Sequence, residues 1–232
     1  METQPARLRH EYKHLISPLD GVALIQRLCK VALPEPYHPG PYFIRSLYFD
    51  NVYDKALREK QDGCQNREKF RIRYYDKNEQ FIRLEKKSKI NRLCAKEQAP
   101  LTKEQTERIL RGDVNWLLTT GNALHAEFFA KMRWQLLRPR VIVDYTRRAF
   151  VYKAGNVRIT LDYDIRSCLN ATAMFNRELP TVPADFSNPV VLEIKYDAFL
   201  PGVLQDIVQL SNTQTSSFSK YAACRLLFSD VE

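Results

Sequence analysis

One short stretch, Lys69-Phe70-Arg71-Ile72-Arg73-Tyr74-Tyr75, restricts the possible fold more than any other part of the chain. Cationic and apolar residues alternate through Tyr74, and side chains on a β-strand alternate between its two faces, so this period of two predicts a strand. One face then carries Lys69, Arg71 and Arg73, and the other carries Phe70, Ile72 and Tyr74. A strand usually buries its apolar face and exposes its polar one. A polar face made only of cations exceeds what solubility requires, and it predicts a surface that binds an anion.

The same alternation recurs elsewhere in the chain. Charged residues occupy every second position in Arg9–Lys13 and in Arg83–Lys87, and Arg158, Asp162, Glu193 and Lys195 continue the pattern. Several strands with one apolar and one charged face predict a sheet whose charged faces converge. We therefore expect a barrel with a basic, water-filled interior and helices packed on its apolar outside. The alternative is an ordinary sheet with a solvated, salt-bridged face.

Strands and helices are both expected, which gives an α+β fold. Strands are predicted at 8–16, 42–49, 69–75, 80–88, 92–98, 140–152, 157–167 and 190–197. Helices are predicted at 17–33, 52–61, from 102 onward, in parts of 117–137, at 201–210 and at 216–228. Ser17 and the Thr102/Gln105 pair have the spacing of helix N-caps. Trp116 and Trp134 are expected to anchor the packing, and 170–189 is expected to form a long loop or lid. No linker or repeat divides the chain, so we expect one domain over residues 7–228.

Composition restricts the partners. A formal net charge of +9 favours anions such as nucleic acid, a membrane surface or a phosphate-rich molecule. Nucleic acid is not expected, because no aromatic stacking platform interleaves with the cations. The five cysteines contain no C-x-x-C pair, so neither a zinc site nor a disulfide framework is indicated. Reduced thiols, no signal peptide and no membrane-spanning segment predict a cytoplasmic protein, whose membrane contact would need a membrane-protein partner.

Catalytic motifs that depend on glycine or histidine are not found. The chain has only seven glycines, with no P-loop and no G-x-G-x-x-G, and its four histidines have no metal-ligand spacing. What remains is many Arg and Lys residues with a few acids on the same strand faces, namely Glu11, Glu85, Asp162 and Glu193. These carboxylates are either counter-charges or hard oxygen ligands for Mg²⁺ or Mn²⁺. A metal in a basic cradle is what phosphoryl transfer requires.

A series of motifs resembles a known family. The motifs are Arg9-x-Glu11-x-Lys13, Tyr48-Phe49-Asp50, Lys69-Phe70-Arg71-Ile72-Arg73, Leu84-Glu85-x-Lys87, Tyr145-x-Arg147-x-Ala149-Phe150, Arg158-Ile159-Thr160-Leu161-Asp162, Leu192-Glu193-Ile194-Lys195 and Phe218-Ser219-Lys220-Tyr221. Together and in this order they resemble the catalytic domain of the vacuolar transporter chaperone (VTC) family. That family belongs to the triphosphate tunnel metalloenzymes, which are related to CYTH domains. The resemblance extends from Arg7 to about Leu227.

The resemblance implies a fold and an activity. The fold is an antiparallel eight-stranded β-barrel tunnel, and the cofactor is Mn²⁺ or Mg²⁺. The activity is an ATP-dependent polyphosphate polymerase, which passes the nucleotide γ-phosphate to a polyphosphate chain in the tunnel. By motif, the catalytic cations are Arg71, Arg73, Lys87, Arg147, Arg158 and Lys195. Lys13, Lys96 and Lys220 would bind phosphate, and Glu193 would hold the metal with Glu11 or Asp162.

Two further functions fit the same residues. Many relatives with this tunnel hydrolyse triphosphate, so a triphosphatase is the first alternative, and a module that binds polyphosphate without turnover is the second. CYTH members begin with Glu-x-Glu-x-Lys, whereas Arg9 stands here in place of the first acid. This departure slightly favours the polymerase. For Lys220 the alternative to phosphate binding is a lysine on the exposed surface of a helix.

Overall fold

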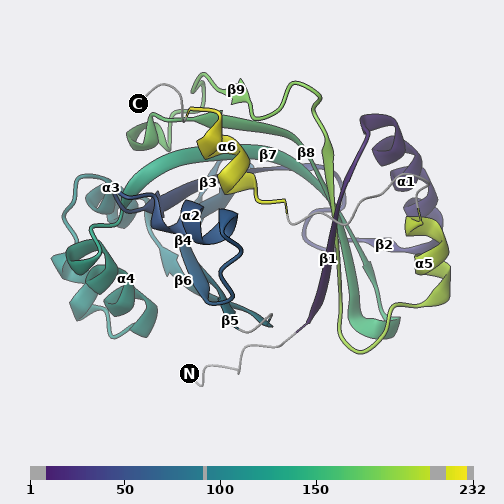
Figure 1. Ribbon diagram of the computed structural model, residues 1–232, viewed down its shortest axis with the longest axis horizontal. Coiled ribbons are helices and arrows are strands. Elements are labelled where there is room, and N and C mark those ends of the chain that lie inside the picture. The colour runs from purple at the N-terminus through teal and green to yellow at the C-terminus, as the bar shows by residue number, and fades with distance from the viewer. Residues whose placement is uncertain (1–8, 91–92, 210–217, 229–232) are drawn as a thin grey trace.

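The computed structural model describes residues 9–90, 93–209 and 218–228. One antiparallel sheet runs through them. Its main strands are β1 (His10–Ile16), β3 (Tyr42–Asp50), β4 (Arg67–Tyr75), β5 (Asn78–Ile90), β6 (Leu93–Leu101), β7 (Arg138–Tyr152), β8 (Val157–Cys168) and β10 (Val190–Tyr196). They are ordered β1-β10-β8-β7-β3-β4-β5-β6, and two short strands, β2 (Leu33–Pro34) and β9 (Val182–Pro183), pair with β7 and β8. The sheet curls strongly on itself (Figure 1).

The eight-stranded antiparallel sheet confirms the fold class expected from the sequence. Each of the eight predicted strands is present, with bounds shifted by up to three residues. In the described part of the chain, the sheet is a half-barrel whose outermost strands are β1 and β6. Strand β7 is continuous from Arg138 to Tyr152, and its pairing with β8 shifts register between Asp144 and Thr146. Such a bulge bends a strand without ending it.

Six helices accompany the sheet in the described residues. They are α1 (Pro18–Val31), α2 (Lys55–Gln61), α3 (Lys103–Leu110), α4 (Ala123–Trp134), α5 (Gly202–Val208) and α6 (Lys220–Leu226), and short 3₁₀ turns lie at Asn115–Thr119, Ala154–Asn156 and Ala171–Ala173. The predicted caps are confirmed: the Ser17 hydroxyl accepts from the Asp20 amide, and Thr102 and Gln105 form a reciprocal capping box. Residues 216–217 of the last predicted helix lie outside the described residues. No described helix has the length and apolar character needed to cross a membrane.

The outward face of the sheet is apolar, and four helices bury it in two clusters. Phe70, Ile72 and Tyr74 of β4 pack in one cluster with Ile109 of α3 and Phe128 of α4. In the other, residues of β8 and β10 pack against Leu24 and Leu28 of α1 and Leu204 of α5. Burying these side chains supplies most of the driving force that holds helices to a sheet. The apolar alternation therefore faces the helices, as predicted.

Helices α2 and α6 depart from this arrangement, because they pack on the inward face. Tyr48 lies directly opposite Arg71 across β3 and β4, so both side chains point to the same side of the sheet. Tyr48 packs with Leu57 of α2 and with Tyr221 of α6, whose ring it stacks at 5.2 Å. The expectation that every helix lies outside therefore holds for α1, α3, α4 and α5 only. Figure 1 shows α6 lying across the curl of the sheet.

One expectation about an individual residue needs correction. Trp134 does not anchor the packing, since its side chain is 83% exposed at the end of α4, whereas Trp116 is partly buried against the outer core. The segment 170–189 is mostly loop, as expected, and contains only the 3₁₀ turn at Ala171–Ala173 and strand β9. There the buried Arg45 donates to the carbonyl oxygens of Met174 and Asn176, at 3.1 and 2.6 Å.

A single buried carboxylate joins α2 and α6. Asp50 accepts from the Ala56 and Leu57 amides at the start of α2, at 2.9 and 3.1 Å, and from the Tyr221 hydroxyl at 2.6 Å. A Tyr221→Phe substitution removes only the last of these bonds and keeps the ring stacked on Tyr48. We expect it to lower the free energy of unfolding by about 1.5–3 kcal/mol, the value of one hydrogen bond to a charged group. Urea unfolding monitored by circular dichroism measures this, and a change below about 0.3 kcal/mol would contradict it.

Candidate active site

The inward face of β4 and β5 carries a buried arginine pair around one carboxylate. Arg71 Nε donates to Glu85 Oε2 at 2.7 Å, and Arg73 Nη1 lies 3.9 Å from the same oxygen. Lys96 of β6 reaches the other oxygen at 2.5 Å. Burial opposes the ionisation of Glu85, but the three cations outweigh it and hold the pKa of Glu85 far below its ordinary value. Glu85 is therefore a permanent counter-charge that fixes three cations.

Hydroxyl groups orient the same two arginines. Arg71 Nη1 donates to the Tyr48 hydroxyl at 2.9 Å. Arg73 donates to Ser46 Oγ at 2.9 Å and to the Tyr145 hydroxyl at 2.7 Å. These bonds hold both guanidinium groups in fixed positions on the inward face of the sheet. Preorganised donors of this kind stabilise the charge of a transferring group without reorganisation cost.

Strands β7 and β8, which lie between β10 and β4 in the sheet order, carry a third arginine, held by Asp162. Arg147 Nε and Nη2 donate to the two oxygens of Asp162, at 2.6 and 2.8 Å. Lys220 of α6 reaches Asp162 Oδ2 at 2.6 Å and lies 4.9 Å from the centre of the Tyr145 ring. Burial raises the pKa of Asp162, but Arg147 and Lys220 outweigh it and keep Asp162 ionised. Lys220 is thus an inward-facing residue and not a lysine on an exposed helix surface.

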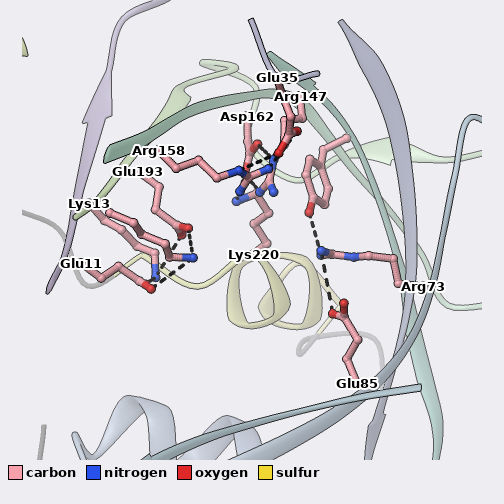
Figure 2. Close-up of polar contacts among 12 residues, drawn as sticks. Glu11, Lys13, Glu35, Arg73, Glu85, Arg147, Arg158, Asp162, Glu193 and Lys220 are labelled. Carbon is pink, nitrogen blue, oxygen red and sulfur yellow. Dashed lines mark hydrogen bonds and ion pairs between the residues drawn. The ribbon is translucent and has the colours of Figure 1, made fainter. Parts of the chain in front are cut away.

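A third group lies on β1 and β10, where two carboxylates alternate with two lysines. Lys195 Nζ lies 2.5 Å from Glu193 Oε1 and 3.4 Å from Glu11 Oε2. Lys13 Nζ bonds Glu11 and lies 3.4 Å from Glu193 Oε2. Burial opposes the charge on Glu193, but Lys195 and Lys13 hold its pKa well below the ordinary value. Figure 2 shows this group facing Arg73 and Glu85 across the interior.

Arg158 has a partner that the sequence pattern did not identify. Its guanidinium donates to Glu35 at 2.9 and 3.1 Å, and the Tyr42 hydroxyl also donates to Glu35 at 2.9 Å. Glu35 lies in the proline-rich segment after α1, where no strand periodicity indicates which way a side chain points. Tyr48 and Tyr145 also line the interior. Tyrosine occurs on either face of a strand, so residue type alone does not predict this position. The only sequence signal for it is the alternation of side chains along each strand.

The structure brings the predicted site residues together around one interior. The cations Lys13, Arg71, Arg73, Lys87, Lys96, Arg147, Arg158, Lys195 and Lys220 all face it, as do Glu11, Asp162 and Glu193. These cations outnumber the carboxylates that contact them, so the interior carries net positive charge. Low-dielectric walls strengthen such a field.

The predicted metal ligands do not form one cluster. No group of three or more acidic, histidine or cysteine side chains able to hold a metal ion occurs in the described part of the chain. Both oxygens of Asp162 are engaged by Arg147 and Lys220. Glu11 and Glu193 share Lys13 and Lys195, which places two hard oxygen donors side by side. This pair suits Mg²⁺ or Mn²⁺ if phosphate oxygens or water supply the remaining ligands.

The curled antiparallel sheet surrounds an ionic interior, and this arrangement is a tunnel fold. A protein of Bacillus halodurans, described as a candidate adenylate cyclase, has a similar fold at 14% identity and a TM-score of 0.50, over 83% of this chain and 82% of that one. A Pyrococcus horikoshii protein aligns over 94% of this chain and 96% of its own, at 11% identity and a TM-score of 0.47. No curated protein matches the sequence.

A model of the VTC domain matches residues 8–228, so the chain belongs to the VTC domain family. The family and the fold support a phosphotransferase related to polyphosphate or triphosphate. The extent of the match agrees with the span of the motifs in the sequence.

Proposed function

We propose that the protein is a metal-dependent, ATP-dependent polyphosphate polymerase, which transfers the γ-phosphate of the nucleotide to a polyphosphate chain. The observation that carries the proposal is the interior itself. Arg71 and Arg73 of β4 and Arg147 of β7 have fixed guanidinium groups on the inward face of the sheet, and Figure 2 shows Arg73 and Arg147 directed into the same interior. Arginine binds phosphate in a bidentate manner, and net positive charge favours a polyanion over a neutral substrate.

The chain's own residues would act by position and charge. Arg71, Arg73 and Arg147 would spread the negative charge that develops on the phosphoryl group in transfer, which is the main requirement of this chemistry. Lys13, Lys195 and Lys220 would hold neighbouring phosphates. Glu11 and Glu193 would hold the metal, which would supply positive charge to offset that of the phosphates. No covalent protein nucleophile is required, since the acceptor is a phosphate oxygen.

One assay separates this proposal from its alternatives. The purified protein is incubated with ATP and Mn²⁺, and the products are resolved by chain length on a gel. Long chains formed from ATP support the polymerase. Orthophosphate alone, from ATP or from tripolyphosphate, would overturn the polymerase in favour of a triphosphatase. Polyphosphate binding without any turnover would support a binding module instead.

We expect Glu193→Gln to reduce metal-dependent turnover strongly, by about 10²-fold, because an amide is a weaker and uncharged ligand for a divalent ion. The substitution should also raise the Mn²⁺ concentration needed for half-maximal rate. Glu178→Gln, at an exposed position, is the matched control and should leave both quantities unchanged. A Glu193→Gln protein with wild-type rate and wild-type Mn²⁺ dependence would remove Glu193 from the metal site.

A further inference from the structure

Three aromatic rings gather at one end of the sheet, where β3 begins and β4 ends. The His38 imidazole stacks on the Tyr42 ring, with 4.1 Å between the ring centres and 24° between the ring planes. The Tyr75 ring lies 6.1 Å from His38 and 6.2 Å from Tyr42. Tyr42 lies opposite Arg147 across β3 and β7, so it points inward together with the cations. Phosphate binding does not require aromatic rings, so this group indicates a different part of a ligand.

The backbone that carries His38 is a rigid turn. Residues 34–41 contain four prolines, whose side-chain rings fix φ. The Glu35 amide donates to the Ala149 carbonyl, and the His38 amide donates to the Glu35 carbonyl, both at 3.1 Å. The imidazole is held too, since its Nδ1 lies 3.3 Å from Asp76 Oδ2. A ring that is already fixed loses little conformational freedom when a ligand stacks on it.

The imidazole of His38 is accessible from solvent. Tyr42 is buried beneath it, whereas the His38 side chain remains 29% exposed although one of its faces covers Tyr42. A second inward-facing stack, of Tyr48 on Tyr221, is buried on both rings and offers no free surface. His38 therefore presents an aromatic surface that is supported from below by Tyr42.

The three rings adjoin the cations of the candidate active site. The Tyr42 hydroxyl donates to Glu35 at 2.9 Å and accepts from Arg158 Nη2 at 3.4 Å. The same Glu35 carboxylate holds the Arg158 guanidinium. Tyr42 thus contacts Arg158 through its hydroxyl and His38 through its ring. Cations and an aromatic surface that are one side chain apart match a ligand with phosphates at one end and a planar base at the other.

We propose that His38 is the stacking surface for the base of a purine nucleoside triphosphate, whose phosphates lie toward Arg158 and Arg147. Histidine and tyrosine rings stack on bases in nucleic-acid-binding proteins, and a purine offers more surface to such a ring than a pyrimidine does. The inference rests on the proposed function and deepens it, since it names the contact that distinguishes a nucleotide from a base-free phosphate chain.

Titration calorimetry tests the stacking surface with two ligands. One is β,γ-imido ATP, and the other is a base-free triphosphate whose phosphorus atoms are bridged by imido groups, so that both resist transfer of the terminal phosphate. We expect His38→Ala to weaken binding of the ATP analogue about tenfold, within the range that alanine substitution gives for a stacked base. Affinity for the base-free triphosphate should stay within twofold of wild type. His38→Phe should retain most of the affinity for the ATP analogue.

The matched control is another histidine that stacks on a tyrosine. His10 stacks on Tyr196 at 5.0 Å on the outward side of the sheet, and His10→Ala should leave both affinities unchanged. Unchanged affinity of His38→Ala for the ATP analogue would overturn the proposal. An equal loss for both ligands would overturn it too, because it would mean that the turn had moved Glu35 and Arg158. If the alanine variant does not fold, His38→Leu against His38→Phe makes the same comparison.

These binding measurements require no turnover, so the inference and the proposed function can fail separately. Weaker binding of the ATP analogue by His38→Ala, in a protein that makes no polyphosphate, would keep the stacking surface and overturn the polymerase. Polyphosphate synthesis with an unchanged KM for ATP in His38→Ala would do the reverse. In an active polymerase the variant should raise KM for ATP about tenfold and leave kcat unchanged, because the base does not change during phosphoryl transfer.

Discussion

A double variant in which Arg71 and Arg73 are both replaced by glutamine is expected to transfer phosphoryl groups about 10³-fold more slowly or worse. The reduction is expected whether the reaction is polymerisation or hydrolysis. Single preorganised donors in comparable sites are worth about 10²–10³-fold, and arginines that stabilise transferring phosphoryl groups about 10³–10⁵-fold. Both side chains are more than nine-tenths buried, and their hydrogen bonds to Tyr48, Ser46 and Tyr145 fix their direction. The measurement is the initial rate of polyphosphate formation from ATP with Mn²⁺, or of phosphate release from tripolyphosphate.

The control for this experiment is an arginine whose side chain lies on the outward face of the sheet, away from the interior. Arg148 of β7 is partly buried over the Phe150 ring on the outward side, and Arg148→Gln should leave the rate unchanged. The double variant retains Lys96 as a partner for Glu85, so it should remain folded by circular dichroism. A folded double variant with wild-type turnover would show that the chemistry occurs elsewhere in the protein.

Replacing Arg45 with methionine is expected to give the largest loss of stability, about 3–5 kcal/mol. Arg45 lies on the outward face of β3, is 2% exposed, and donates to both oxygens of Asp144 at 2.8 and 2.7 Å. The same guanidinium holds the carbonyls of Met174 and Asn176. Its loss would leave Asp144 as a buried charge without its arginine, and would remove one donor from each of the two carbonyl groups, of which the Met174 carbonyl keeps the Tyr74 hydroxyl.

A second substitution checks the cause of this loss. Arg45→Met combined with Asp144→Leu removes both charges, and it should recover part of the stability because the unpaired carboxylate is gone. Urea unfolding of the two single variants and the double variant gives the coupling free energy. A double variant no more stable than Arg45→Met would mean that the carbonyl contacts, and not the unpaired carboxylate, dominate. Turnover should be largely retained in folded Arg45→Met, since Arg45 lies on the side of the sheet away from the interior.

The strand pattern could be predicted from the sequence because successive side chains of a strand must alternate between its two faces. Once Phe70, Ile72 and Tyr74 are buried against helices, Lys69, Arg71 and Arg73 must point to the other side. The same reasoning placed Glu11, Lys13, Glu85, Lys87, Glu193 and Lys195 correctly with respect to the sheet. The helix caps at Ser17 and Thr102 were equally predictable, since a cap depends on residues only three positions apart.

Long-range partners were not predictable in this way. Glu35 reaches Arg158 from a loop without periodicity, across 123 positions of the sequence. Asp162 was expected as a metal ligand by its motif, yet in the structure Arg147 and Lys220 engage both of its oxygens. The exposure of Trp134 depends on which turn of α4 faces the sheet, and composition cannot decide that. These contacts depend on how distant segments approach each other.

The sequence by itself determined that several strands each carry a charged face and an apolar face, because the period of two belongs to the backbone and requires no tertiary information. It also determined that the surface formed by these charged faces together carries a net positive charge. Only the tertiary structure decided that α6 enters the inward face to bring Lys220 to Asp162, and which cations receive a carboxylate. The physical reason is that neutralising a buried charge requires a partner within a few ångströms in space, and separation along the chain does not specify that distance.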